Sequence, residues 1–223
     1  MSAVCIYFGS LSASPHRRPI MRRVTPLPNS LAPTVLSRLA LAGALSVPLG
    51  VPLAAQSMSE GFKSEIEMHF DGSARKVVML AEAMPAGNYG WSPAEGVASV
   101  ARVYLHIARY NYMYLEQNMG IASPVDRRAY MAWEADVTAR FQSATPTEAD
   151  KEWVGGIVNA SMTHVRESLD AMSDSDLTAS TGLYGRQVQH WSVLLQLVAH
   201  MNEHLGQSIA YARMNGVVPP WSM

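Results

Sequence analysis

Residues 186–215, RQVQHWSVLLQLVAHMNEHLGQSIAYARMN, decide the fold. Apolar side chains recur along this stretch at three- and four-residue steps, the period of one buried helix face. The residues of that face are Trp191, Leu194, Val198, Met201, Leu205, Ile209 and Ala212. Gly216 and the pair Pro219-Pro220 follow and end the helix. A helix this long with one apolar face predicts partners of similar length.

Three more long helices are predicted upstream. Proline-free runs rich in helix formers place them at about Ser59 to Met84, Val97 to Met119 and Glu148 to Met172, with a shorter helix from Arg127 to Phe141. Residues 173–185 are polar and contain glycine, so they are predicted to form a loop. No strand-like alternation is visible. The sequence therefore predicts an all-α fold, an antiparallel four-helix bundle.

The first 55 residues have the pattern of a targeting segment, a signal peptide. Arg22 and Arg23 precede an apolar stretch from Leu39 to Leu53, which Ala54-Ala55-Gln56 follows. Pro and Gly interrupt this stretch, and it is shorter than the roughly 20 apolar residues of a membrane-spanning helix. We therefore expect export to the periplasm or beyond, with cleavage after Ala55, and no retained membrane anchor. Met21 is an alternative start of the chain, and residues 56–223 make up one domain.

Charge is distributed unevenly between these two parts. Five of the 17 Lys and Arg residues and none of the 18 Asp and Glu residues lie in residues 1–55, so the domain carries a formal net charge of −6. An acidic domain without a Lys/Arg cluster has no general affinity for nucleic acid or anionic lipid. The single cysteine, Cys5, lies in the targeting segment. Any metal site in the domain must therefore use nitrogen and oxygen ligands.

Two histidines share one edge of the buried face in the last helix. His200 and His204 are one turn apart, about 40° around the helix, so both imidazoles point the same way. His106 shares its face of the second helix with Val103 and Tyr110, which directs it toward other protein. One interpretation is three core histidines that hydrogen-bond to their surroundings. The other is a three-nitrogen site for one divalent ion such as Zn²⁺, Ni²⁺ or Fe²⁺.

The other histidines of the domain, His69, His164 and His190, have no such helical partner and are not predicted to be ligands. The segment His200-Met201-Asn202-Glu203-His204 also fits an inverted zinc-peptidase motif, in which the glutamate is the general base. Such enzymes take a third, acidic ligand from further along the chain. No Asp or Glu follows Glu203, which disfavours the peptidase interpretation.

Together these residues resemble a known family. His106, the run from His200 to Gln207 with its His-x-x-x-His-x-Gly-Gln spacing, and the loop Trp91-Ser92-Pro93 are similar to the DinB-like (DinB/YfiT-like) family of metal-binding four-helix bundles. The resemblance covers nearly all of residues 56–223. It implies a divalent ion on His106, His200 and His204, commonly zinc or nickel, with iron and manganese as alternatives.

The resemblance also implies a metal-dependent enzyme, a transferase or isomerase that activates a small-molecule thiol. Hydrolysis by a metal-bound hydroxide is an alternative on chemical grounds. Export favours water, because low-molecular-weight thiol cofactors are kept mainly in the cytoplasm. Glu203 or Tyr110 is a candidate proton shuttle, and Gln207 is a candidate to orient a ligand or a histidine.

Two alternatives without catalysis stay open. One is an exported metal-binding or stress-related module, which a fourth protein ligand on the metal would favour. The other is an interaction protein whose bundle buries the three histidines. Ala199, Gly206 and Ala210 form a small-residue stripe on the last helix, which predicts close helix contact inside the bundle or in a homodimer.

Overall fold

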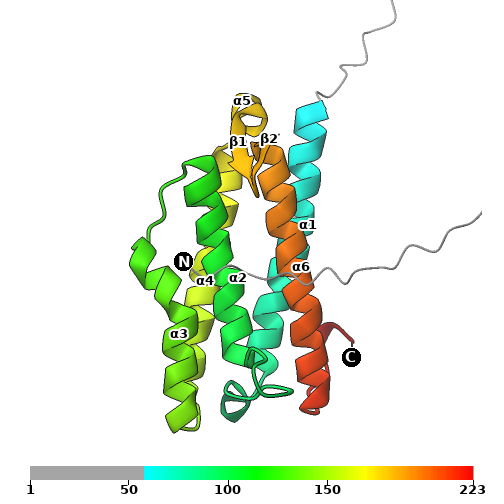
Figure 1. The fold of residues 1–223 in the computed structure, drawn as a ribbon. Coiled ribbons are helices and arrows are strands. Elements are labelled where there is room, and N and C mark those ends of the chain that lie inside the picture. The colour runs from blue at the N-terminus through cyan, green and yellow to red at the C-terminus, as the bar shows by residue number, and fades with distance from the viewer. Residues whose placement is uncertain (1–57, 223) are drawn as a thin grey trace, which may run out of the picture. The chain divides into compact units, whose positions relative to one another are not determined.

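The computed structural model describes residues 58–222 and is mostly helical (Figure 1). The targeting segment predicted for residues 1–55 lies outside this range. The six α-helices of the described part are α1 (Met58–Ala83), α2 (Val100–Met113), α3 (Arg127–Ser143), α4 (Glu148–Ala171), α5 (Asp174–Thr178) and α6 (His190–Met214). A π-helical turn, Tyr114–Asn118, continues α2. None of the described helices is long and apolar enough to cross a membrane.

Helices α1, α2, α4 and α6 enclose the core. Helix α1 packs against α4 and α6, and α2 packs against the same two helices from the other side. Fully buried aromatic and aliphatic side chains fill the space between them, among them Phe70, Leu80, Tyr104, Leu105 and Leu169. Burial of each such side chain stabilises the fold by about 1.5–3 kcal/mol. The helical part of the all-α prediction is confirmed.

The directions of the four core helices α1, α2, α4 and α6, which form a ring, differ from the predicted antiparallel bundle. Helices α1 and α6 start at the same end, where the Phe62 and Trp191 rings lie 5.5 Å apart. Helix α4 opposes α1, because Lys151 near its start donates to the carbonyl of Glu82 at the end of α1, at 2.8 Å. Helix α6 opposes α2 in the same way, so α2 and α4 run parallel (Figure 1). The arrangement is antiparallel only for α1 with α4 and α2 with α6.

Helix α3 is the reason for the parallel pairs. It packs against α2 outside the ring and returns the chain to the end where α4 begins (Figure 1). Its 17 residues extend about 25 Å, enough to run beside all of α2. Asp126 caps its start by accepting from the backbone N–H of Arg128 at 2.8 Å.

A short helix and a β-hairpin replace the predicted loop. Strands β1 (Ser180–Leu183) and β2 (Arg186–Gln189) pair antiparallel between α5 and α6. Tyr184 and Gly185 form the turn with φ values of 50° and 76°, the backbone that a two-residue hairpin turn requires. The predictions of a loop over residues 173–185 and of a helix start at Arg186 are therefore wrong, because Gln189 ends a strand and α6 starts at His190.

Helix α6 keeps most of its predicted buried face. Leu194, Val198, Met201, Leu205 and Ala212 are buried, whereas Trp191 is 37% exposed. The small-residue stripe, Ala199, Gly206 and Ala210, faces solvent rather than the bundle interior. The structure thus leaves this stripe uncovered by the described chain, and a homodimer through it stays a prediction.

Candidate metal centre

The three predicted histidines meet between α2 and α6. Their ring nitrogens supply one atom each that lies within 4.8 Å of the other two. The Nε2 atoms of His106 and His200 are 3.2 Å apart. The ring centroid of His204 lies 4.6 Å from that of each of the other two histidines. Residues separated by 94 positions in the chain thus form one cluster.

Local structure brings each histidine to this point. Ser99 caps α2 by accepting from the backbone N–H of Arg102, so the helix starts at Val100 rather than at the predicted Val97. His106 then falls in the middle of α2, opposite the one-turn pair His200 and His204 on α6. His200 is buried, while the other two histidines are partly exposed. The cluster therefore has a buried side and a side that solvent reaches.

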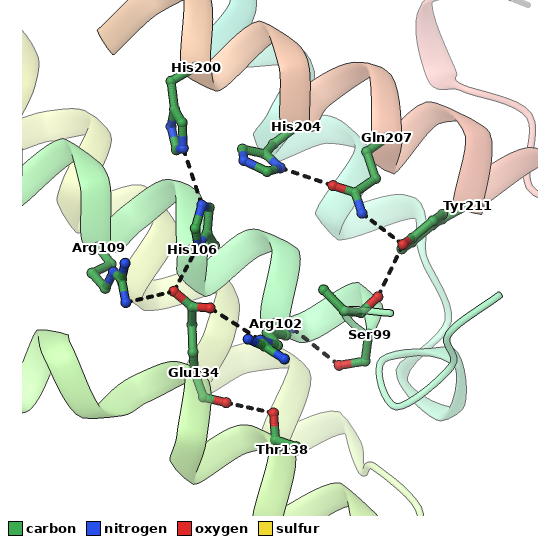
Figure 2. Close-up of polar contacts among 11 residues, drawn as sticks. Ser99, Arg102, His106, Arg109, Glu134, Thr138, His200, His204, Gln207 and Tyr211 are labelled. Atoms are coloured by element: carbon green, nitrogen blue, oxygen red, sulfur yellow. Dashed lines mark hydrogen bonds and ion pairs between the residues drawn. The ribbon is translucent and has the colours of Figure 1, made fainter. Parts of the chain in front are cut away.

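A carboxylate from α3 orients the first imidazole. Glu134 Oε1 lies 2.7 Å from His106 Nδ1, on the far side of the ring from His200 (Figure 2). The acceptor holds the proton on Nδ1 and leaves the Nε2 lone pair directed at the cluster. Arg109 Nη1 lies 3.1 Å from Glu134 Oε1, and Arg102 Nε donates to Oε2 at 3.2 Å.

An amide orients His204 in the same way. Gln207 Oε1 lies 2.9 Å from His204 Nδ1, and Gln207 Nε2 donates to the Tyr211 hydroxyl at 2.7 Å (Figure 2). That hydroxyl in turn donates to the carbonyl of Ala98, at 3.1 Å. The chain of bonds fixes the amide with its oxygen toward the histidine, so Nδ1 carries the proton and Nε2 is free. Of the two roles left open for Gln207, the structure shows that it orients a histidine.

The surroundings keep the cluster in the form that a cation needs. Burial, followed by the charges of His204 and His106, lowers the pKa of His200 to about 3. Burial also lowers the pKa of His204. Both rings are therefore neutral near pH 7, and neutral imidazole is the ligand form.

Glu134 stays ionised despite its burial. Burial alone raises the pKa of this carboxyl group, but the hydrogen bond and charge of His106, the charge of Arg109 and the hydrogen bond from Arg102 together lower it to about 2. The carboxylate is therefore a permanent hydrogen-bond acceptor for His106.

The residues present fit one divalent ion. Three imidazole nitrogens converge, and the Nδ1 atoms of two of the rings are already bonded elsewhere. An ion about 2.0–2.1 Å from each nitrogen in a tetrahedral site holds its ligand nitrogens about 3.3 Å apart. The 3.2 Å between His106 Nε2 and His200 Nε2 matches that spacing. No other group of three or more potential ligands clusters in this way within residues 58–222.

Aromatic rings wall one side of the cluster. The Tyr110 ring lies 4.2 Å from the His200 ring and 4.6 Å from the His106 ring, centroid to centroid. The Tyr114 ring presents its edge to His200 at 5.9 Å. Of the two candidate proton shuttles, Tyr110 therefore contacts the cluster, whereas Glu203 is exposed on α6.

The histidines that were not predicted as ligands lie outside the cluster. His69 is exposed beside Glu65 on α1, and the His164 ring stacks on Tyr112 at 5.4 Å. His190 is the first residue of α6. None of the three joins the group of metal-ligating side chains.

Glu134 is the site residue that the sequence analysis missed. Its signal was indirect: Arg102 and Arg109 lie four residues before and three after His106, on one face of α2. Two half-buried arginines there require an acid from another element. Sequence alone does not identify the acid that pairs with these arginines, because α3 and the segments beside it contain several acidic residues.

Comparisons with known proteins give a family and a similar fold. A family model described as "DinB superfamily" matches residues 69–208, a range that contains the three histidines and Glu134. A DinB-like protein from Bacillus cereus ATCC 10987 has a similar fold, with 19% identity and a TM-score of 0.55 over 72% of this chain and 95% of that chain. A DinB-like protein from Bacillus subtilis gives 20% identity and a TM-score of 0.48, over 68% and 92%. No curated protein matches the sequence.

Proposed function

This chain belongs to the DinB superfamily, and we propose that it binds one divalent metal ion through His106, His200 and His204 and acts as a metal-dependent enzyme on a small molecule. The observation that carries the proposal is the convergence of three ring nitrogens within 4.8 Å. Zinc and nickel suit three imidazole ligands best, and iron and manganese are alternatives.

The surroundings of the histidines support a reactive rather than a sealed site. A metal held by three protein nitrogens keeps a position for water or substrate, and when bound it supplies a lowered pKa to a coordinated water or thiol. His106 is 23% exposed at its side chain, so a small molecule can reach the cluster from solvent. Tyr110 packs on His106 and His200 and is the candidate proton shuttle.

Two reaction classes follow from this arrangement, transfer to a small-molecule thiol and hydrolysis. The export predicted for residues 1–55 favours hydrolysis, because thiol cofactors are kept mainly in the cytoplasm. The second candidate function is a non-catalytic metal-binding or stress-related module. One observation favours it. Within the described chain, Glu134 is the one carboxylate bonded to any of the three histidines, and it already binds His106 and two arginines. Glu134 is therefore not free to act as a general base.

Metal analysis of the full chain, purified without a polyhistidine tag, tests the metal site. We expect about one ion per chain in the wild type and none in the His200→Ala/His204→Ala variant. The matched control is His69→Ala/His190→Ala, which removes two histidines outside the cluster and should retain the ion. Wild-type protein that is metal-free and takes up neither added zinc nor added nickel would overturn the proposal.

Assays of the metal-loaded protein then separate the two functions. Turnover of an ester or amide panel, or thiol transfer, that is lost in the His200→Ala/His204→Ala variant supports the enzyme. Equal and negligible rates in both proteins, with one ion bound to the wild type, support the non-catalytic module.

A further inference from the structure

Two arginines on α2 carry more positive charge than their partner requires. Arg102 and Arg109 both contact Glu134, and the three side chains together leave one positive charge in excess. The remaining hydrogen bond of this carboxylate goes to His106. Its acceptor sites are therefore shared among three donors, and further guanidinium N–H groups need other acceptors.

The donors that Glu134 leaves free belong to both arginines. Arg109 uses Nη1 for Glu134, while its Nε is buried and has no acceptor within residues 58–222. Arg102 uses Nε, so its two terminal nitrogens have no protein acceptor in the described chain. The Arg102 side chain is 42% exposed, which leaves these nitrogens accessible to a ligand. A guanidinium with two adjacent free N–H groups binds a planar carboxylate in a bidentate way.

A groove between α2 and α3 holds these donors. It has a volume of about 510 Å³, and its lining includes Arg102, Arg109, Glu134 and the apolar side chains of Met131, Ala135 and Ala139. A second cavity of about 250 Å³ continues from it toward residues 90–99 and shares Arg102, Thr138 and Gln142 with it. The groove thus combines a cationic side from α2 with an apolar side from α3.

We propose that this groove is a binding site for a small organic carboxylate with a short apolar chain. The carboxylate pairs with the free N–H groups of Arg102, and the apolar chain lies over Met131, Ala135 and Ala139. Glu134 is the single acid among the lining residues. Since two arginines already neutralise it, it does not repel the ligand. None of the three histidines lines the groove, so the ligand does not contact them.

Butyrate is the probe, and the His200→Ala/His204→Ala protein is the background, because a carboxylate also binds to a metal ion. Titration calorimetry at low ionic strength should detect one butyrate per chain. Arg102→Met should weaken binding at least about tenfold, the loss of a charge-assisted hydrogen bond. The control Arg128→Met makes the same charge change at an exposed position on α3 outside the groove and should leave the dissociation constant unchanged.

Two more measurements test the proposal. Met131→Glu adds a negative charge to the groove at a residue that is 43% exposed, so the fold is retained and butyrate binding should be lost. Inorganic phosphate should bind more weakly than butyrate, because it has no apolar chain. Absence of butyrate binding, equal binding by the Arg102→Met variant, or tighter binding of phosphate would each overturn the proposal. Since the background protein lacks two of the three histidines, none of these outcomes reports on the metal site.

Discussion

Glu134 Oε1 lies 2.7 Å from His106 Nδ1, and this contact links α3 to the histidine cluster between α2 and α6. The carboxylate fixes the tautomer of the imidazole, and the two arginines fix the carboxylate. The candidate metal centre therefore includes a residue beyond its three predicted ligands, on a helix that carries none of them.

Glu134→Gln should weaken metal binding by about 10–100-fold. The amide keeps the shape of the side chain but removes the charge that holds His106 and two guanidinium groups. Competition with a chromogenic chelator measures the change. Asp136→Asn is the control, because it makes the same charge change at an exposed position on α3. Equal affinities of the wild type and Glu134→Gln would show that His106 needs no partner.

Gln207→Leu should weaken metal binding less than Glu134→Gln does. The substitution removes the acceptor of His204 Nδ1, but the lost bond is neutral, and such bonds are roughly half as strong as charge-assisted ones. The same chelator competition applies, with the exposed Gln187→Leu on β2 as the control. A loss as large as that of Glu134→Gln would contradict this ranking.

Asp150, far from the histidines, makes a pH-dependent contribution to the free energy of unfolding. Hydrogen bonds from the Thr147 backbone and side chain, together with the charge of Arg140, lower the pKa of this buried carboxyl group against the effect of its burial. A lowered folded-state pKa stabilises the fold above the usual value of 3.8, and this contribution is lost as the pH falls through the folded value.

Asp150→Asn should therefore lower the free energy of unfolding at pH 7 by about 1–3 kcal/mol. The difference from the wild type should shrink when urea unfolding is repeated at pH 3. Asp170→Asn, an exposed change near the end of α4, should not destabilise at either pH. A difference that does not depend on pH would assign the effect of Asp150 to packing alone.

Gly185→Ala should destabilise the protein by about 1–2 kcal/mol, because φ at this position is +76° and a Cβ is disfavoured there. Gly182→Ala on β1 is the matched control. A Cβ at either glycine meets no atom within 4 Å, so the two variants differ in backbone conformation rather than in space. Equal midpoints of urea unfolding for the two variants would contradict the hairpin turn.

Export predicts a mature N-terminus near Gln56. Fractionation of cells that express the full chain, followed by mass spectrometry of the N-terminal peptide, checks this expectation. An intact N-terminus in the cytoplasmic fraction would contradict it and would restore thiol transfer as the favoured reaction class.

The helices were predictable from the sequence because their periodicity is local. Gly216 follows the end of α6 as predicted, and α4 starts at the predicted Glu148. The hairpin was not predictable in the same way. Its strands have four residues each, which is too short for a clear two-residue period, and Tyr184 takes a positive φ without being glycine. Helix direction was missed because it depends on how α3 packs, which no local pattern records.

In the candidate site, too, features set within one helix were more predictable than contacts between helices. His200 and His204 were predictable as a pair, since one turn of α6 sets their geometry. Their approach to His106 was inferred from buried faces and a family resemblance, and the structure confirms that the three rings meet. Glu134 was missed because its contact with His106 joins two separate helices.

Helix α3 packs mainly against α2 and is joined to the rest by residues 120–126 and 144–147. A peripheral helix of this kind opens by local unfolding more readily than the core does. Each opening removes Glu134 from His106 while the bundle stays folded. We therefore expect the residence time of an ion at the candidate centre to depend on the opening rate of α3, so that amide hydrogen exchange in residues 127–143 and metal exchange report the same event.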